Sequence, residues 1–169
     1  MIAGRDDLLQ HMNALLLRRS RVHTQLLSYD TTFNFGDFYL SVLLFRSVCF
    51  HENPVTPALF MLHERKLCST HKRFVDVLCE KVPALNDSNC VHVTDGEPSF
   101  DVFEAAFPKL NKVFCWNHTL SAAKLWLHNH NASSAETQLY VDHIHTLLLS
   151  TNSASYQSEY REKVKLNFL

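Results

Sequence analysis

The stretch that decides the fold is Leu26-Leu27-Ser28-Tyr29-Asp30-Thr31-Thr32-Phe33-Asn34, a run of apolar, aromatic and β-branched residues that delivers an aspartate. A second run, Val91-His92-Val93-Thr94-Asp95-Gly96-Glu97, repeats the pattern. Runs of this composition predict strands, and we expect each aspartate to stand where its run ends. Two such strands side by side would bring Asp30 and Asp95 close together, an arrangement that costs energy unless a cation lies between them.

These two aspartates admit two interpretations from spacing alone. In the first, Asp30 and Asp95 bind a divalent metal ion for phosphodiester chemistry. In the second, Asp30 opens a turn and Asp95-Gly96 is an ordinary turn dipeptide in an α/β domain without this chemistry. The position of the two carboxylates in space distinguishes between them.

The composition is that of an ordinary globular protein. The chain has 169 residues, of which 46% are hydrophobic and 20% charged, and we expect one domain with a real core. Its net charge of -1 provides no overall basic field for nucleic acid, although charge can gather on one face. No apolar run approaches the roughly 20 residues that a membrane span needs. Five cysteines and an acidic start predict an intracellular protein that is not secreted.

The hydrophobic pattern also predicts the order of the elements. After an amphipathic helix at 6–19 come three strands, a helix, a strand, a helix and a strand, followed only by helices. The arginines Arg18, Arg19 and Arg21 fall at the end of the first helix, as a solvated helix end or a phosphate contact. We expect a cap at Ser69 or Thr70 for the next helix. The further ranges are strands at 38–46, 58–62 and 112–116 and helices at 99–107, 119–130, 136–149 and 156–164.

This order matches a ribonuclease H-like α/β fold, a mixed sheet with flanking helices. In that fold, the first strand and the strand after the first helix lie side by side and carry catalytic acids. We expect the strand at 38–46 to be central and buried on both faces, because it is nearly continuous in apolar residues. The prolines Pro54 and Pro57 are expected to end regular strand pairing before residue 58.

Several segments in this order resemble Mutator-like element (MULE) transposases over residues 23–150. The segments are Tyr29-Asp30-Thr31-Thr32-Phe33, Gly36-Asp37-Phe38-Tyr39, Pro54 and Pro57 before Leu59-Phe60, His63-Glu64, Val93-Thr94-Asp95-Gly96-Glu97 and Cys115-Trp116-Asn117-His118. The resemblance implies an Asp-Asp-Glu catalytic core that cuts and rejoins DNA with divalent metal ions, Mg²⁺ or Mn²⁺. Asp30 and Asp95 match the first two acids and metal ligands, and Cys115 and His118 match the family's Cys-x-x-His signature.

The resemblance also implies a domain organisation and partners. Residues 1–22 would be an N-terminal helix, 23–118 a partial ribonuclease H-like transposase core, and 119–169 the truncated start of a helical insertion. The implied partner is DNA at transposon ends, in the nucleus, with a homo-oligomer in a full-length protein and no membrane association.

The third acid of the family has no convincing match here. Glu136 would cap a helix, and Glu159 and Glu162 fit a solvated helix in which either pairs with Lys163. We therefore expect a fragment, inactive alone, whose strands around 38–45 keep apolar surface partly uncovered at an incomplete C-terminal end. The alternative is a transposase-derived, catalytically dead domain that binds DNA or a protein partner.

Two Cys-x-x-His pairs make a zinc site formally available. Cys68 and His71 share the spacing of Cys115 and His118. The first pair is expected at a helix start and the second just past the fifth strand, on the acidic side of the sheet. We therefore do not expect a structural zinc ion.

Overall fold

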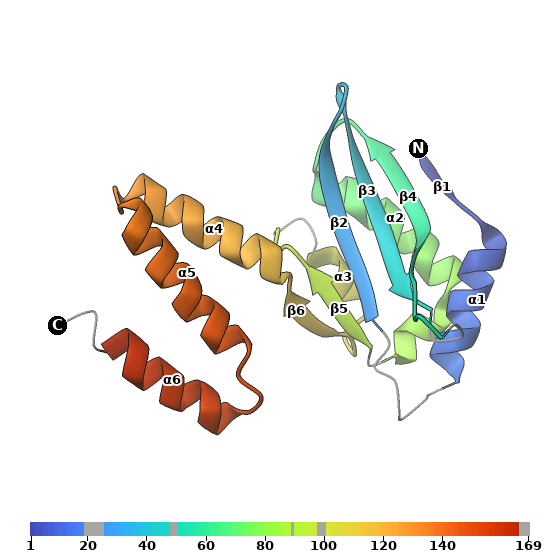
Figure 1. Cartoon of the computed structure of the whole chain (residues 1–169). Helices are drawn as coiled ribbons and strands as arrows, with labels where there is room; N and C mark the ends of the chain where they lie inside the picture. The colour runs from blue at the N-terminus through green and yellow to red at the C-terminus, as the bar shows by residue number, and fades with distance from the viewer. Residues whose placement is uncertain (19–25, 48–50, 89, 98–100, 166–169) are drawn as a thin grey trace. The chain divides into compact units, whose positions relative to one another are not determined.

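The computed structural model describes residues 1–18, 26–47, 51–88, 90–97 and 101–165, with the backbone alone for residues 32–35 and 162–165. It comprises two compact units, Met1–Cys115 and Trp116–Leu169, which are described separately. Figure 1 shows the strands in the first unit and the C-terminal helices in the second. The domain boundaries expected at residues 22 and 118 stay predictions.

The first unit is built on a six-stranded mixed sheet with the order β1-β4-β3-β2-β5-β6. Strands β2, β3 and β4 form an antiparallel meander, and β5 joins β2 in parallel, followed by β6 parallel to β5. The bounds are β1 Ile2–Gly4, α1 Asp6–Leu17, β2 Leu26–Phe35, β3 Phe38–Arg46, β4 Val55–His63, α2 Cys68–Lys81, the 3-10 helix η1 Pro83–Asp87, β5 Val91–Thr94, α3 Asp101–Ala106 and β6 Asn111–Phe114.

This topology is ribonuclease H-like, so the predicted fold class is confirmed. The three antiparallel strands come first, α2 leads from β4 across to β5, and α3 leads from β5 to β6. A parallel neighbour requires such a crossover connection, because a tight hairpin can join only antiparallel strands. The consequence is that β2 lies between its hairpin partner β3 and the late strand β5.

One face of the sheet packs against helices α1, α2 and α3 to form the core (Figure 1). Tyr29 of β2 lies at its centre with 0% of its surface exposed. Its ring centroid lies 5.0 Å from that of Phe74 in α2 and 4.6 Å from that of Phe103 in α3. The residue before Asp30 is therefore fixed between the sheet and two helices.

The other face is half-buried, which corrects one prediction. Strand β3 is central as expected, but its burial alternates between the two faces. Ser41, Leu43 and Phe45 are buried under the helices, whereas Leu40, Val42 and Leu44 are half-buried. The reason is that the side chains of a strand point to opposite faces in turn, and the three helices of this unit cover one face.

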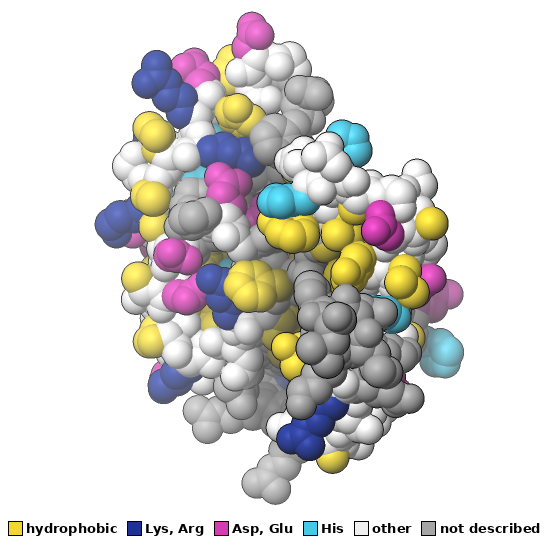
Figure 2. All heavy atoms as spheres, turned by 90° about the vertical axis from the view of Figure 1, so that its left-hand side faces the viewer, with side chains coloured by type: hydrophobic (Ala, Val, Ile, Leu, Met, Phe, Trp, Pro, Cys, Tyr) yellow, Lys and Arg dark blue, Asp and Glu magenta, His cyan; other side chains and the backbone are white. Residues whose placement is uncertain are grey.

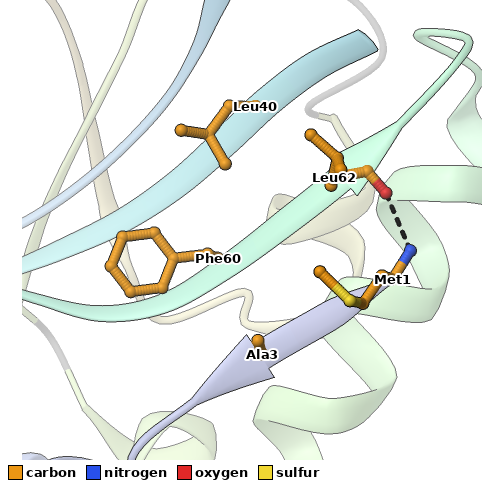
Figure 3. A pocket seen from close by; sticks show the side chains of 5 residues that line it. All are labelled: Met1, Ala3, Leu40, Phe60 and Leu62. Atoms are coloured by element: carbon orange, nitrogen blue, oxygen red, sulfur yellow. Dashed lines mark hydrogen bonds between the residues drawn. The ribbon is translucent and has the colours of Figure 1, made fainter. Parts of the chain in front are cut away.

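Strand β1 was not predicted, because three residues are too short for a recognisable pattern. It pairs antiparallel with β4, and the ammonium group of Met1 donates a 2.8 Å hydrogen bond to the carbonyl oxygen of Leu62 (Figure 3). A small apolar pocket lies beside β1 and is lined by Met1, Ala3, Leu40, Phe60 and Leu62 (Figure 3).

Strand β4 begins earlier than expected. The prediction that pairing ends at the prolines is wrong for Pro57, which lies inside β4 opposite Leu44. The register shifts between Leu43 and Leu44. Because a bulge interrupts the regular ladder, it accommodates a residue that has no N–H to donate.

Helix ends differ from the predictions in two places. Helix α2 begins at Cys68 with Leu67 as its N-cap residue and no side-chain cap, so the predicted cap at Ser69 or Thr70 is wrong. Helix α1 ends at Leu17, and Arg18 follows it as the C-cap residue. The other two arginines of the predicted cluster lie outside the described residues, as do 99 and 100 of the third predicted helix.

The second unit consists of helices α4 Trp116–Asn129, α5 Ser134–Leu148 and α6 Ser153–Lys165. A capping box starts α5, in which Ser133 and Glu136 exchange side-chain and backbone hydrogen bonds. This capping satisfies amide groups that the first turn of a helix leaves without a partner. None of the helices in the described part of the chain has the length and apolar content that crossing a membrane requires.

Candidate functional site

The register of β2 and β5 places Asp30 and Asp95 opposite one another. The two strands run in parallel, with Leu26 beside Val91 and Ser28 beside Val93. Asp30 and Asp95 each lie two residues after this last pair, so their side chains leave the same face of the sheet. That is the half-buried face, opposite the helices.

The two carboxylates converge in the structure. A carboxylate oxygen of Asp30 and one of Asp95 lie within 4.8 Å of each other, and both side chains are half-buried. This upper limit is below the roughly 7 Å within which carboxylates are expected to share metal ions. Their role as metal ligands and catalytic residues remains a prediction.

Backbone hydrogen bonds orient both carboxylates. The amide of Thr31 donates to Oδ1 of Asp30 at 2.8 Å, and the amide of Glu97 donates to Oδ1 of Asp95 at 2.9 Å. Each acid is therefore held on the backbone of its own segment.

The expected strand ends need one correction. Asp95 does follow directly on the last residue of β5, but Asp30 lies in the middle of β2, which continues to Phe35. Strand β2 is longer because β3 pairs with it on its other side up to the turn at Gly36, whose φ is 65°. Asp30 therefore gains rigidity from β3 that a residue at a strand end would lack.

A buried polar chain supports Asp30 from the opposite face. The hydroxyl groups of Thr31 and Ser41 lie 2.7 Å apart, and Ser41 Oγ lies 2.8 Å from Nε2 of His63. Nδ1 of His63 donates to the carbonyl oxygen of Arg65 at 2.9 Å. The three side chains form one continuous hydrogen-bonded chain. The chain fixes the register of β2, β3 and β4.

A second buried contact links β2 to α2. Tyr29 OH and Nδ1 of His71 lie 2.7 Å apart, and both residues are 0% exposed. Burial raises the pKa of the Tyr29 hydroxyl. Burial, together with the neighbouring His63, lowers the pKa of His71 to about 4, so the imidazole is neutral at pH 7. Tyr29 and a neutral His71 therefore form a buried hydrogen bond, which is a structural contact between β2 and α2.

The Cys-x-x-His residues lie where the sequence order places them. Cys115 directly follows β6, and its amide donates to the carbonyl oxygen of Thr94 at 2.7 Å, at the same end of the sheet as Asp95. His118 lies in the first turn of α4. Cys68 and His71 lie in the first turn of α2. Among the described residues, no cysteine belongs to a group of three or more side chains that could hold a metal ion.

The candidates for a third acid all lie in the second unit. Glu136 accepts hydrogen bonds from the amide and hydroxyl of Ser133 at 2.8 and 2.6 Å, so it caps α5 as predicted. Ser133 lowers the pKa of this carboxyl group. Glu159 lies in α6 and is half-buried, with Oε2 shielded from solvent, so the predicted solvated position is wrong for this residue. The side chain of Glu162 is outside the described residues.

Sequence reasoning missed an ion pair beside the acids. Nζ of Lys66, in the connection from β4 to α2, lies 2.9 Å from Oε2 of Glu97, in the segment after β5. The signal was present but weak, since a charged residue two positions after Asp95 reads as an ordinary loop residue.

The fold and the paired acids define a ribonuclease H-like α/β protein with a candidate metal centre. The chain is similar in structure to the catalytic domain of the Mos1 mariner transposase, with a TM-score of 0.37 and 9% sequence identity over 95% of this chain and 87% of that chain. No protein-family model and no curated protein matches the chain.

Proposed function

We propose that this chain contains the metal-binding acids of a ribonuclease H-like polynucleotidyl transferase of the transposase type, as its resemblance to MULE transposases implies. The observation that carries the proposal is the convergence of the Asp30 and Asp95 carboxylates within 4.8 Å on neighbouring parallel strands. Two like charges this close repel each other and destabilise the folded protein, and a bound cation offsets that repulsion.

The donor atoms fit a hard divalent cation. Carboxylate oxygens are the ligands that Mg²⁺ and Mn²⁺ prefer, whereas zinc favours sulfur and imidazole nitrogen. In phosphodiester chemistry such an ion activates the attacking oxygen and stabilises the leaving one. The contribution of the protein is to hold Asp30 and Asp95 on backbone amides, already oriented, before an ion binds.

We propose that the chain binds metal but does not transfer DNA strands alone. Positioning two ions for in-line displacement generally needs a third acidic ligand. Glu136 is engaged in capping α5, Glu159 is half-buried in α6, and the side chain of Glu162 lies outside the described residues. Under this proposal the chain is a partial catalytic core. The second candidate is a catalytically dead, transposase-derived domain that binds DNA or a protein partner.

DNA at transposon ends is the partner that the proposal implies, with action in the nucleus and assembly with further copies in a full-length protein. On the described part of the face in Figure 2, basic and acidic side chains are intermixed, in agreement with a net charge of -1. DNA contact would therefore use local lysines and arginines, and the salt dependence of the DNA affinity would give the number of phosphates that they contact.

The test is Mn²⁺ binding and DNA cleavage by four proteins: the unmodified chain, Asp30→Asn, Asp95→Asn and Asp37→Asn. The last is the matched control, because Asp37 is an exposed acid in the turn after β2. We expect the first two variants to lose Mn²⁺ binding in a calorimetric titration, the control to retain it, and none of the proteins to nick supercoiled DNA. Equal Mn²⁺ affinity in all four would refute the metal site.

Cleavage by the unmodified chain would have a different meaning. If it nicks DNA and both acid variants do not, a glutamate within this chain completes the site, and the proposal of a partial core is wrong. Binding of DNA with no binding of Mn²⁺ would favour the second candidate function.

A further inference from the structure

The ion pair between Lys66 and Glu97 joins two loops that the sequence keeps far apart. Lys66 belongs to the connection between β4 and α2, and Glu97 to the segment that follows β5. Their charged atoms are 2.9 Å apart, and the side chains are only 16% and 24% exposed. Fully exposed pairs contribute little to stability, but a shielded pair is screened less by salt and holds its geometry better.

Lys66 is itself held in place by the sheet. Its ammonium group lies 5.5 Å from the centroid of the Tyr39 ring, a distance at which a cation is attracted to an aromatic face. Tyr39 lies on β3, with its ring centroid 5.7 Å from that of His63 on β4. The ammonium group of Lys66 is therefore held in place by the sheet, and the segment after β5 contacts it through Glu97.

Glu97 transmits this position to Asp95 through its backbone. The amide of Glu97 donates to Oδ1 of Asp95 at 2.9 Å, closing a tight turn around Gly96. Gly96 has a φ of 85°, a conformation that residues with a side chain rarely adopt. The side chain of Glu97 is bound to Lys66 while its amide is bound to Asp95, so one residue sets both contacts.

We propose that Lys66 and Glu97 are positioning residues that set the carboxylate of Asp95 against that of Asp30. The inference rests on the proposed function, because the property it predicts is metal affinity. Neither residue needs to touch the ion. They fix the turn from which Asp95 projects, and without the pair Asp95 would sample orientations that no longer converge with Asp30.

The experiment is a Mn²⁺ titration of Lys66→Met, Glu97→Gln and the double variant, below the melting temperature of each protein. We expect each single change to weaken Mn²⁺ binding by about 10–100-fold, the loss usual for residues that orient metal ligands. The double variant should bind no more weakly than the weaker single variant, because both changes break one contact. Lys66→Arg, which keeps the charge, should retain most of the affinity.

The matched control is another ion pair of the same length. Lys72 and Asp76 lie 2.9 Å apart in α2, and their side chains are 67% and 59% exposed. Lys72→Met should leave Mn²⁺ affinity unchanged. A similar loss of affinity in this variant would overturn the inference, since it would show that breaking an ion pair away from the acids weakens Mn²⁺ binding as much.

Failure of the inference can be told apart from failure of the proposed function. If Asp95→Asn abolishes Mn²⁺ binding but Lys66→Met and Glu97→Gln bind as tightly as the unmodified chain, the positioning role is wrong and the metal site stands. If Asp95→Asn binds Mn²⁺ as tightly as the unmodified chain, the metal site itself is wrong, and the positioning role with it.

Discussion

Removing one of the two facing carboxylates should make the metal-free protein more stable. Asp95→Asn keeps the Oδ1 acceptor for the amide of Glu97 and removes one negative charge. At the 4.8 Å limit of their separation, two unit charges repel by roughly 1 kcal/mol in water and roughly 3.5 kcal/mol at an effective dielectric constant of 20. Both side chains are half-buried and water reaches them, so we expect a gain of about 1–2 kcal/mol.

Metal should reverse this order of stability. At a Mn²⁺ concentration of about 100 times the dissociation constant, binding stabilises the unmodified chain by about 2.7 kcal/mol. Asp95→Asn should gain almost nothing, because half of the acidic pair is missing. The variant is therefore expected to be the more stable protein in EDTA and the less stable one in saturating Mn²⁺.

Urea unfolding followed by far-ultraviolet circular dichroism measures the free energy of unfolding in EDTA and, in a second titration, in Mn²⁺. Asp37→Asn, in the exposed turn, controls for the loss of a negative charge and should follow the unmodified chain in each. The reasoning fails if Asp95→Asn is less stable than the unmodified chain in EDTA. It also fails if Mn²⁺ stabilises both proteins equally, since the two carboxylates then do not share an ion.

Three further predictions concern the surroundings of the site. Ser41→Ala should lower the free energy of unfolding by about 2–4 kcal/mol in a urea titration, because it leaves the buried side chains of Thr31 and His63 without their hydrogen-bond partner. Adding His63→Leu to this variant should restore part of the lost stability, and strictly additive effects of the two changes would contradict the prediction. Burial lowers the pKa of His92 to about 4, below its value of about 6.5 in an unfolded chain, so the unfolded state takes up the proton first and stability falls as the pH drops from 7 to 5. His92→Phe should reduce this fall by about 2 kcal/mol, and an unchanged pH profile of the melting temperature would refute it. Gly96→Ala should cost about 1–2 kcal/mol and weaken Mn²⁺ binding, because φ is 85° and the new Cβ would lie 2.9 Å from the ring of Phe114; a variant as stable as the unmodified chain would show that this turn relaxes freely.

The order of the elements could be predicted from the sequence, because the spacing of apolar residues differs clearly between the strands and the helices. Strands β2, β3 and β5 are short runs of apolar and β-branched residues, and the helices show apolar residues at three- and four-residue steps. This order was sufficient to place β2 beside β5. The closeness of Asp30 and Asp95 then followed from the sheet, with no information about their side chains.

Other features depend on contacts that no local pattern contains. The length of β2 beyond Asp30 depends on its pairing with β3, and the start of α2 at Cys68 occurs without any side-chain cap. The buried chain from Thr31 through Ser41 to His63 was missed because polar residues in a strand suggest a solvent-facing side. A usable signal was present, since Thr31, Ser41 and His63 stand at even spacing from the core residues Tyr29, Leu43 and Met61.

The pairing of β2 with β5 has a consequence for how the molecule forms. Strands β2, β3 and β4 are neighbours in the chain and can assemble as a local meander, whereas Leu26 must find Val91 across the whole of that meander and α2. Contacts between distant parts of a chain close slowly, because the entropy of the loop is lost before the contact is gained. We therefore expect Asp30 to occupy its strand before Asp95 pairs beside it. In a refolding experiment, the capacity to bind Mn²⁺ would appear after most of the circular dichroism signal, as a late marker of the native topology.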